Sequence, residues 1–314
     1  MNKSNKTAEN DLIQELISEK KSNRRWKNIR FFILIALIAF FFSRLSSLSD
    51  SESTHLHQPY YALIRLNGTI ASNTGFSASR TLPELSRAFS DKDAKGVLLL
   101  INSPGGSPTQ ATIIHDKILD LKKHYRKKVI VVGEDSLASA AYLVATAADK
   151  IYVNPNTVTG SIGVIMASFN LSGLIKKLGI KRRVFTAGIH KDAIDTYRPM
   201  SQASQTKIQS ILDQTHKNFI NLVLDGRKNK INPHNQTLFT GEFWLGNQAT
   251  KLGLADGVME YWQAAKKEFG TQRAVDYTDS QSSFSQIVKQ FATSLSIPVL
   301  TQSHLHILEM SKSG

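Results

Sequence analysis

The fold of this chain is decided at residues 96–106, which read GVLLLINSPGG. Residues 97–101 are apolar without interruption, a pattern typical of a strand that is buried on both faces of a sheet. The proline and the paired glycines that follow predict a tight turn. Strands of this kind belong to parallel sheets covered by helices, so we expect an α/β fold.

The segments around this stretch alternate between strand and helix. Apolar residues recur every three or four positions over 108–125 and predict a helix with one buried stripe. Shorter apolar runs predict strands, and an alanine-rich stretch predicts a buried helix. The expected strands are 60–66, 96–101, 129–132, 151–153 and 159–166, and the expected helices are 108–125 and 137–148. This alternation implies parallel strands joined by right-handed crossovers.

Beyond residue 200 the pattern is mainly helical. Ser201 is a suitable N-cap for a helix with an apolar stripe. That stripe consists of Ile208, Ile211, Leu212, Phe219, Ile220 and Val223. Residues 240–257 predict a shorter helix between two turns. Residues 271–314 are weakly patterned, although 284–295 are compatible with an amphipathic helix.

An apolar run at residues 31–42 predicts a single membrane anchor near the N-terminus. A span needs about 17–25 residues, so the anchor is expected over 29–48, with Arg30 and Arg44 reaching the interfaces. A cleaved signal peptide is the alternative, but residues 43–47 lack an Ala-x-Ala cleavage site. Basic residues concentrate before the run, so the N-terminus is expected in the cytoplasm. The rest of the chain is then expected on the periplasmic or extracytoplasmic side of the inner (cytoplasmic) membrane.

Composition argues against several kinds of site. The chain has 314 residues and no cysteine, which excludes disulfides and cysteine-ligated metals. No histidine pair has the spacing of a metal site, so no metal is expected. The net charge of +14 is dispersed apart from small clusters, and no nucleic-acid-binding motif accompanies it. A nucleic-acid partner is therefore not expected.

Three short segments carry candidate chemistry. The turn at 102–106 has two glycines before a helix, so its backbone N–H groups can face an anion. Ser139 follows a buried strand near a helix start, where the sites of parallel sheets form. Lys191 follows Ala187-Gly188 in a polar stretch and offers an amine. Taken alone, each also fits an ordinary structural role: a glycine-rich turn, a packing serine and a solvated lysine.

In order and content these segments resemble the bacterial signal peptide peptidases, in their short form with one catalytic unit. The resemblance rests on NSPGG at 102–106, AADKIY at 147–152, TGSIGV at 159–164, GIHKD at 188–192 and LGLADG at 252–257. It covers roughly residues 60–258. It implies a crotonase/Clp protease-like repeated β-β-α core with parallel strands, preceded by one N-terminal transmembrane helix.

The resemblance implies a role for each of five positions. Ser139 would be the nucleophile and Lys191 its general base. The backbone N–H groups of Gly106 and Ala140 would form the oxyanion hole, and Ser161 would orient the lysine amine. The family usually has Ser-Gly-Gly-Tyr where this chain has Ser-Ala-Ala-Tyr at 139–142, so an extra methyl group would narrow the pocket.

The expected function is that of a membrane-anchored serine endopeptidase with a Ser/Lys dyad and no cofactor. The resemblance implies peptide substrates such as signal-peptide remnants, and a homo-oligomeric ring or dome. His190 raises a Ser-His-Asp alternative, but the spacing identifies no carboxylate to orient it. Two further hypotheses come from different functional classes: a crotonase-like acyl-thioester enzyme and a catalytically silent membrane scaffold.

The expected domains follow from these segments. Residues 1–28 form a cytoplasmic leader, 29–48 the transmembrane anchor and 49–58 a linker. Residues 59–270 form the serine–lysine peptidase domain, and 271–314 form a C-terminal tail.

Overall fold

The computed structural model describes residues 33–37, 40 and 58–278. The chain divides into two compact units, Met1–Gln58 and Pro59–Gly314, and every element named below belongs to the second. The predicted leader, most of the predicted anchor and linker, and the predicted helix at 284–295 lie outside the described residues. None of the helices described is both long enough and apolar enough to span a bilayer.

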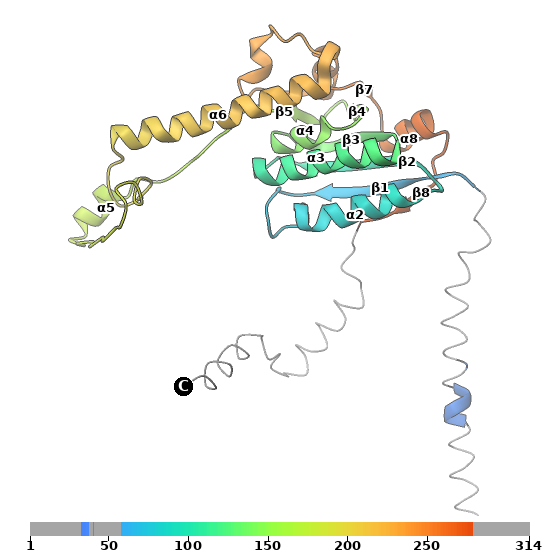
Figure 1. The fold of residues 1–314 in the computed structure, drawn as a ribbon, viewed down its shortest axis with the longest axis horizontal. Coiled ribbons are helices and arrows are strands. Elements are labelled where there is room, and N and C mark those ends of the chain that lie inside the picture. The colour runs from blue at the N-terminus through green and yellow to red at the C-terminus, as the bar shows by residue number, and fades with distance from the viewer. Residues whose placement is uncertain (1–32, 38–39, 41–57, 279–314) are drawn as a thin grey trace, which may run out of the picture. The chain divides into compact units, whose positions relative to one another are not determined.

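An eight-stranded sheet forms the centre of the described part of this unit (Figure 1). Its main path runs β6-β5-β3-β2-β1-β8; β4 branches from β3, and β7 pairs with β4. The strands are β1 Tyr60–Asn67, β2 Ala94–Ser103, β3 Val129–Ala138, β4 Lys150–Val153, β5 Val158–Gly160, β6 Phe243–Leu245, β7 Gly257–Val258 and β8 Ala274–Asp276. The pairings are parallel except that of β5 with β6, which confirms the predicted α/β fold with a mostly parallel sheet.

Helices cover both faces of the sheet. The helices are α2 Ala78–Ser90, α3 Pro108–Tyr125, α4 Ala140–Ala145, α5 Ser172–Lys177, α6 Gln202–Arg227, α7 Gly246–Lys251 and α8 Tyr261–Phe269. The larger core joins one face of the sheet to α2, α3 and α4. On the other face, Ala264 and Ala265 of α8 pack with Leu98 and Ile130. Both faces of β2 are therefore buried, as its apolar run predicts.

The predicted helix at 137–148 differs from the structure at both ends. β3 continues to Ala138, and α4 spans only Ala140–Ala145. Ser139 separates them with φ 54° and ψ −126°, which is not a helical conformation. The predicted strand at 159–166 was also too long, because the positive φ angles of Gly160 and Ser161 end β5 at Gly160.

The apolar stripe of α6 is only half buried. Phe219 and Val223 pack into the core, whereas Ile211 is 49% exposed. The N-terminal half of α6 continues beyond the sheet and leads to α5 (Figure 1). The structure describes all of residues 163–202, and none of them is buried. We call residues 163–202 the arm. The predicted helix with its apolar stripe is present, and only the second half of the stripe meets the core.

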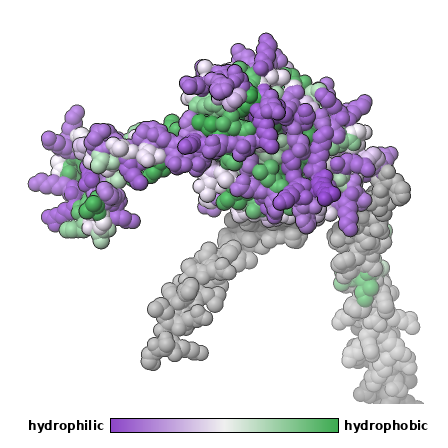
Figure 2. Space-filling model, turned by 45° about the horizontal axis from the view of Figure 1, so that its top comes forward, coloured by the Kyte–Doolittle hydropathy of each residue, from purple (hydrophilic) through white to green (hydrophobic). Residues whose placement is uncertain are grey.

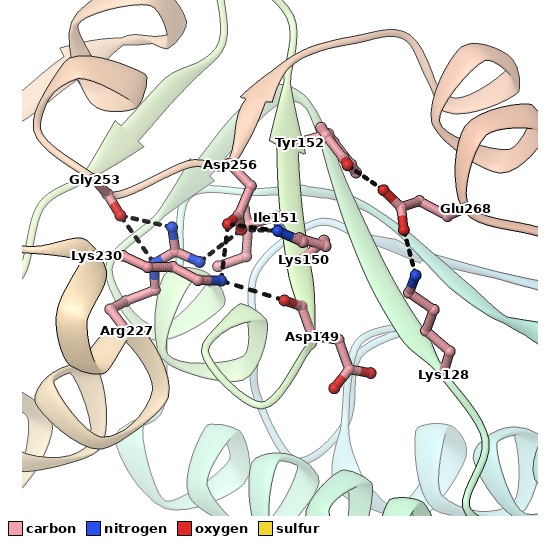
Figure 3. Close-up of polar contacts among 10 residues, drawn as sticks. All are labelled: Lys128, Asp149, Lys150, Ile151, Tyr152, Arg227, Lys230, Gly253, Asp256 and Glu268. Carbon is pink, nitrogen blue, oxygen red and sulfur yellow. Dashed lines mark hydrogen bonds and ion pairs between the residues drawn. The ribbon is translucent and has the colours of Figure 1, made fainter.

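An ion-pair network fixes the C-terminal end of α6 (Figure 3). The Arg227 guanidinium, 1% exposed, pairs with Asp256 at 2.8 Å and donates hydrogen bonds to the Gly253 carbonyl. Asp256 also pairs with Lys230 at 2.8 Å and accepts the backbone N–H of Ile151 at 2.8 Å. Because Ile151 belongs to β4, the network joins α6 to the sheet.

Candidate active site

Ser139 lies at the sharp junction between β3 and α4. Its backbone N–H donates to the carbonyl of Gly160 at 2.8 Å, and its own carbonyl accepts the N–H of Leu143 at 3.1 Å. Its φ of 54° and ψ of −126° are unusual for a residue with a side chain. Such strain persists only where the surroundings enforce it, and it is common at functional sites. The side chain is half-buried and borders a cavity.

The glycine turn lies so close to its neighbours, Ser139 among them, that a residue with a side chain would not fit at position 105 or 106. A Cβ built on Gly105 would lie 2.7 Å from the Ser139 Cβ and 2.9 Å from the backbone nitrogen of Ala140. One built on Gly106 would lie 2.2 Å from the carbonyl oxygen of Ile70. Both glycines also have positive φ angles, 104° and 145°. The two glycines of NSPGG therefore allow the backbone of the turn to pack directly against the serine.

The Gly106 N–H points away from Ile70. Ile70 donates its N–H to the Gly105 carbonyl and accepts the N–H of Ser107, both at 2.8 Å, around a parallel bridge to Gly106. In such a bridge the N–H of the central residue faces the opposite side. Gly106 lines the same cavity as Ser139. Its N–H is therefore suited to meet an oxyanion that forms beside the serine.

Ala140 is the other predicted donor. It is the first residue of α4, where backbone N–H groups have no partner within the helix. It also lines the cavity, beside Ser139 and Gly106. The structure thus brings together three of the five predicted site residues.

The cavity has a volume of about 650 Å³. Most of its wall comes from α3, α4, α6 and residues 163–166. Its apolar side chains include Leu143, Met166, Leu212, Phe219 and Leu222. The sequence analysis identified neither this wall nor its position, because α3 and α6 are about 100 residues apart along the chain. A cavity of this size and character accommodates apolar side chains.

Ser161 follows Gly160, whose carbonyl accepts the backbone N–H of Ser139. It has φ 50°, and its N–H donates to the Glu242 carbonyl at 2.7 Å. The next carbonyl, that of Ile162, contacts the His216 ring nitrogen Nε2 at 3.1 Å. His216 of α6 thus contacts the backbone next to the site.

Lys191 lies in the arm and does not line the cavity. The Lys191 side chain is exposed, and its Cγ lies next to Gly188. The backbone N–H of Lys191 donates to the Gly188 carbonyl at 3.2 Å. The arm is held together by its own contacts: the Leu171 N–H donates to the Thr196 carbonyl at 2.7 Å, and Arg182 pairs with Asp195. Within this one chain, the structure does not bring Lys191 to Ser139.

Two family models match the chain. Peptidase family S49 matches residues 121–276, and Clp protease matches residues 62–159. Between them they cover the sheet, the glycine turn, Ser139 and the arm.

Three relatives have similar sequences. The "Putative signal peptide peptidase SppA" of Enterococcus faecium is 32% identical over 203 residues, which cover 62% of this chain and 58% of that protein. The "Na(+)/H(+) antiporter NhaA" of Brucella melitensis is 38% identical over 213 residues, which cover 66% of this chain and only 29% of that protein. In both cases the chain spans less than two thirds of the relative.

The third relative is matched over more of its length. The "Putative protease slr0021" of Synechocystis sp. is 30% identical over 195 residues, which cover 62% of this chain and 68% of that protein. The family match runs from the last turns of α3 to β8 and includes the strained serine. The chain therefore belongs to peptidase family S49.

Proposed function

We propose that this chain is a serine endopeptidase in which Ser139 is the nucleophile and Lys191 the general base. The observation that carries the proposal is the Ser139 junction, a strained serine beside the bare glycine turn at an apolar cavity. A serine hydroxyl is a weak nucleophile unless a base removes its proton. A lysine amine serves as that base only when it is unprotonated.

The proposed reaction has two stages. The Ser139 Oγ attacks the peptide carbonyl carbon while its proton moves to the Lys191 Nζ, and the carbonyl oxygen becomes an oxyanion. Collapse of this intermediate breaks the C–N bond, and Lys191 returns the proton to the leaving amine. Water then attacks the acyl-enzyme with Lys191 again as base, which releases the new carboxyl terminus and restores the serine.

The oxyanion would be held by the N–H groups of Gly106 and Ala140. Removal of one such donor from an acyl-transfer site costs about 3–4 kcal/mol of transition-state stabilisation. Ser161 would orient the lysine amine, because its backbone is fixed next to the carbonyl that binds Ser139.

We infer that Lys191 acts at the Ser139 of a neighbouring subunit in a homo-oligomer. α6 has 26 residues, about 39 Å of helix, and Figure 1 shows α5 beyond the end of α6 that is remote from the sheet. The arm also exposes large apolar side chains, including Phe169 at 80%, Phe185 at 92% and Ile189 at 87%. Figure 2 shows a small group of hydrophobic residues among the hydrophilic ones at the far end of the arm. Large apolar side chains that are exposed together on one segment are typical of a protein interface, and a ring or dome of subunits would cover them.

The substrates would be apolar peptides derived from the membrane, such as signal-peptide remnants. The apolar wall of the cavity supports this class. The apolar run at 31–42 supports a membrane anchor, with the peptidase domain on the extracytoplasmic side.

The test is peptide cleavage by the full-length protein and three variants. Ser139→Ala and Lys191→Ala should each lower kcat by at least about a thousandfold, because each removes a member of the reacting pair. Lys181→Ala is the matched control, since Lys181 is another exposed lysine of the arm, and it should retain activity. Full activity in either dyad variant, with the fold intact, would refute the proposed mechanism.

A further inference from the structure

The cavity beside Ser139 is a groove between α3 and α6. The residues that face it recur at helical spacing on both helices: Thr109, Thr112 and Asp116 on α3, and Leu212, Thr215 and Phe219 on α6. Gly106 and Ser139 lie where α3 begins. The groove therefore has a reacting end at the start of α3 and continues along that helix.

The charge of this groove is confined to one position. Among the residues that line it in the described part of the chain, Asp116 alone carries a charged side chain. The other lining residues are apolar or neutral. In a chain with a net charge of +14, this places an isolated negative group in the groove.

The Asp116 carboxylate is held by a buried neighbour. Its Oδ1 lies 2.9 Å from Nδ1 of His115, whose side chain is only 4% exposed. The side chain of Asp116 itself is 64% exposed, so the other carboxylate oxygen, Oδ2, can meet a ligand. The next lysine, Lys117, pairs with Asp120 at 3.1 Å instead.

The position of Asp116 along α3 sets its distance from the reacting end. It lies eight residues after Pro108, which corresponds to about 12 Å of helix. An extended peptide advances about 3.3–3.6 Å per residue. A peptide lying in the groove would therefore bring its third or fourth residue from the scissile bond to Asp116.

We propose that Asp116 is a specificity-determining residue that binds a lysine or arginine of the substrate, three or four residues from the scissile bond. This rests on the proposed peptidase function and narrows its substrate class. The groove selects an apolar stretch at the cleaved bond, and Asp116 selects a basic residue on one side of it. A basic segment next to an apolar one is the composition of a secretory signal peptide.

The test uses fluorogenic apolar peptides that differ at one position, with either lysine or norleucine there. That position is moved through the first four residues on each side of the scissile bond, which mass spectrometry of the products identifies. For the full-length protein, kcat/KM should be about fivefold higher with lysine at the third or fourth position on one side, the size expected of a partly exposed ion pair. The ratio should be near one on the other side.

The variants separate Asp116 from the general charge of the surface. Asp116→Asn should bring the lysine-to-norleucine ratio close to one, and Asp116→Lys should favour a glutamate peptide instead. Asp120→Asn is the matched control, because Asp120 is an equally exposed aspartate of α3 that does not line the groove; it should keep the ratio. A ratio near one at every position in the unmodified protein, or an unchanged ratio in Asp116→Asn, would overturn the proposal.

A binding measurement keeps this proposal separate from the peptidase mechanism. Full-length Ser139→Ala protein is titrated with the same labelled peptides and followed by fluorescence anisotropy. Suppose that the unmodified protein cleaves none of the peptides, whereas Ser139→Ala binds the lysine peptide about fivefold more tightly than the norleucine peptide, through Asp116. The specificity proposal then stands and the mechanism fails. If cleavage depends on Ser139 but neither cleavage nor binding prefers lysine, the mechanism stands and the specificity proposal fails.

Discussion

Gly106 shows how much of the site depends on a single backbone conformation. It has φ 145°, and a Cβ there would meet the Ile70 carbonyl oxygen at 2.2 Å. Gly68 also has a positive φ, 85°, but a Cβ there would have open space around it. Substituting alanine at each glycine therefore distinguishes the cost of an unfavourable φ alone from the cost of an unfavourable φ together with a steric clash.

Replacing Gly106 with alanine should destabilise the fold more than replacing Gly68. Gly106→Ala adds a clash to an unfavourable φ and should lower the free energy of unfolding by about 3 kcal/mol or more. Gly68→Ala has only the unfavourable φ and should cost about 1–2 kcal/mol. Urea unfolding followed by circular dichroism measures both. Equal losses in the two variants would show that the approach of Ile70 to the turn is not as close as described.

Single residues of the site could be predicted where a short motif carries them. NSPGG predicted a turn of bare backbone after a buried strand, and the structure has that turn against Ser139. The start of α4 was predicted too early, because the alanines after β3 favour helix and nothing in the pattern indicates the positive φ of Ser139. Asp116 was missed because its neighbours in the groove come from a distant helix.

At the scale of elements, the Arg227–Asp256 pair joins α6 to the sheet. The guanidinium is 1% exposed and the Asp256 side chain 7%. Arg227→Met would remove one of the two cations that lie 2.8 Å from the buried Asp256 carboxylate, which keeps Lys230. The loss of these charged hydrogen bonds should lower the free energy of unfolding by about 2–3 kcal/mol. Arg65→Met, which breaks a half-exposed pair with Asp276, should cost no more than about 1 kcal/mol. Similar losses for the two variants in chemical denaturation would contradict this account of the network.

The same network gives a pH dependence. Burial alone would raise the pKa of Asp256, but hydrogen bonds from Lys230 and Arg227 outweigh it and hold that pKa below its ordinary value. The stability that the ionised group contributes is therefore complete well above the ordinary aspartate value of about 3.9. It is lost as the pH falls from there through the lower pKa of the folded state.

Unfolding at several pH values tests this dependence. The unmodified protein should be more stable than Asp256→Asn at pH 7, and the difference should be the same at pH 6. The difference should narrow as the pH falls below about 4. A gap that stays constant down to pH 3 would show that the pKa of Asp256 is not lowered in the folded protein, and a gap that widens would show that it is raised.

The elements themselves were largely predictable, and α6 shows the limit. The helix over 108–125 and the buried strands follow from periodicity and apolar runs. The stripe on α6 is equally periodic, yet only its second half meets the core. Periodicity identifies an apolar face but not its partner, and for Ile211 the packing within this chain supplies none.

At the scale of the whole molecule, the arm should assemble subunits. Phe185→Asp would place a charge on a side chain that is 92% exposed in the single chain. In an oligomer built through the arm, this change should lower the mass measured by sedimentation of the detergent-solubilised protein. Leu119→Asp, at a 44% exposed position of α3, should leave the mass unchanged. If the unmodified protein sediments as a monomer, the arm has no role in assembly.

Mixing two inactive variants tests whether the base comes from a neighbour. Ser139→Ala subunits retain Lys191, and Lys191→Ala subunits retain Ser139. If the pair forms between subunits, a mixed assembly contains intact sites, and about a quarter of the activity should return when equal amounts exchange freely. A mixture that stays inactive despite verified subunit exchange would place both residues of each working pair in one subunit.

The most direct measurement of the central claim is the site of labelling by a serine-reactive acylating probe. The full-length protein is treated with the probe, digested and analysed by mass spectrometry. The account predicts an adduct on Ser139 that disappears in Lys191→Ala and persists in Lys181→Ala. A folded protein that takes no label at Ser139, or labels there equally well without Lys191, would contradict it.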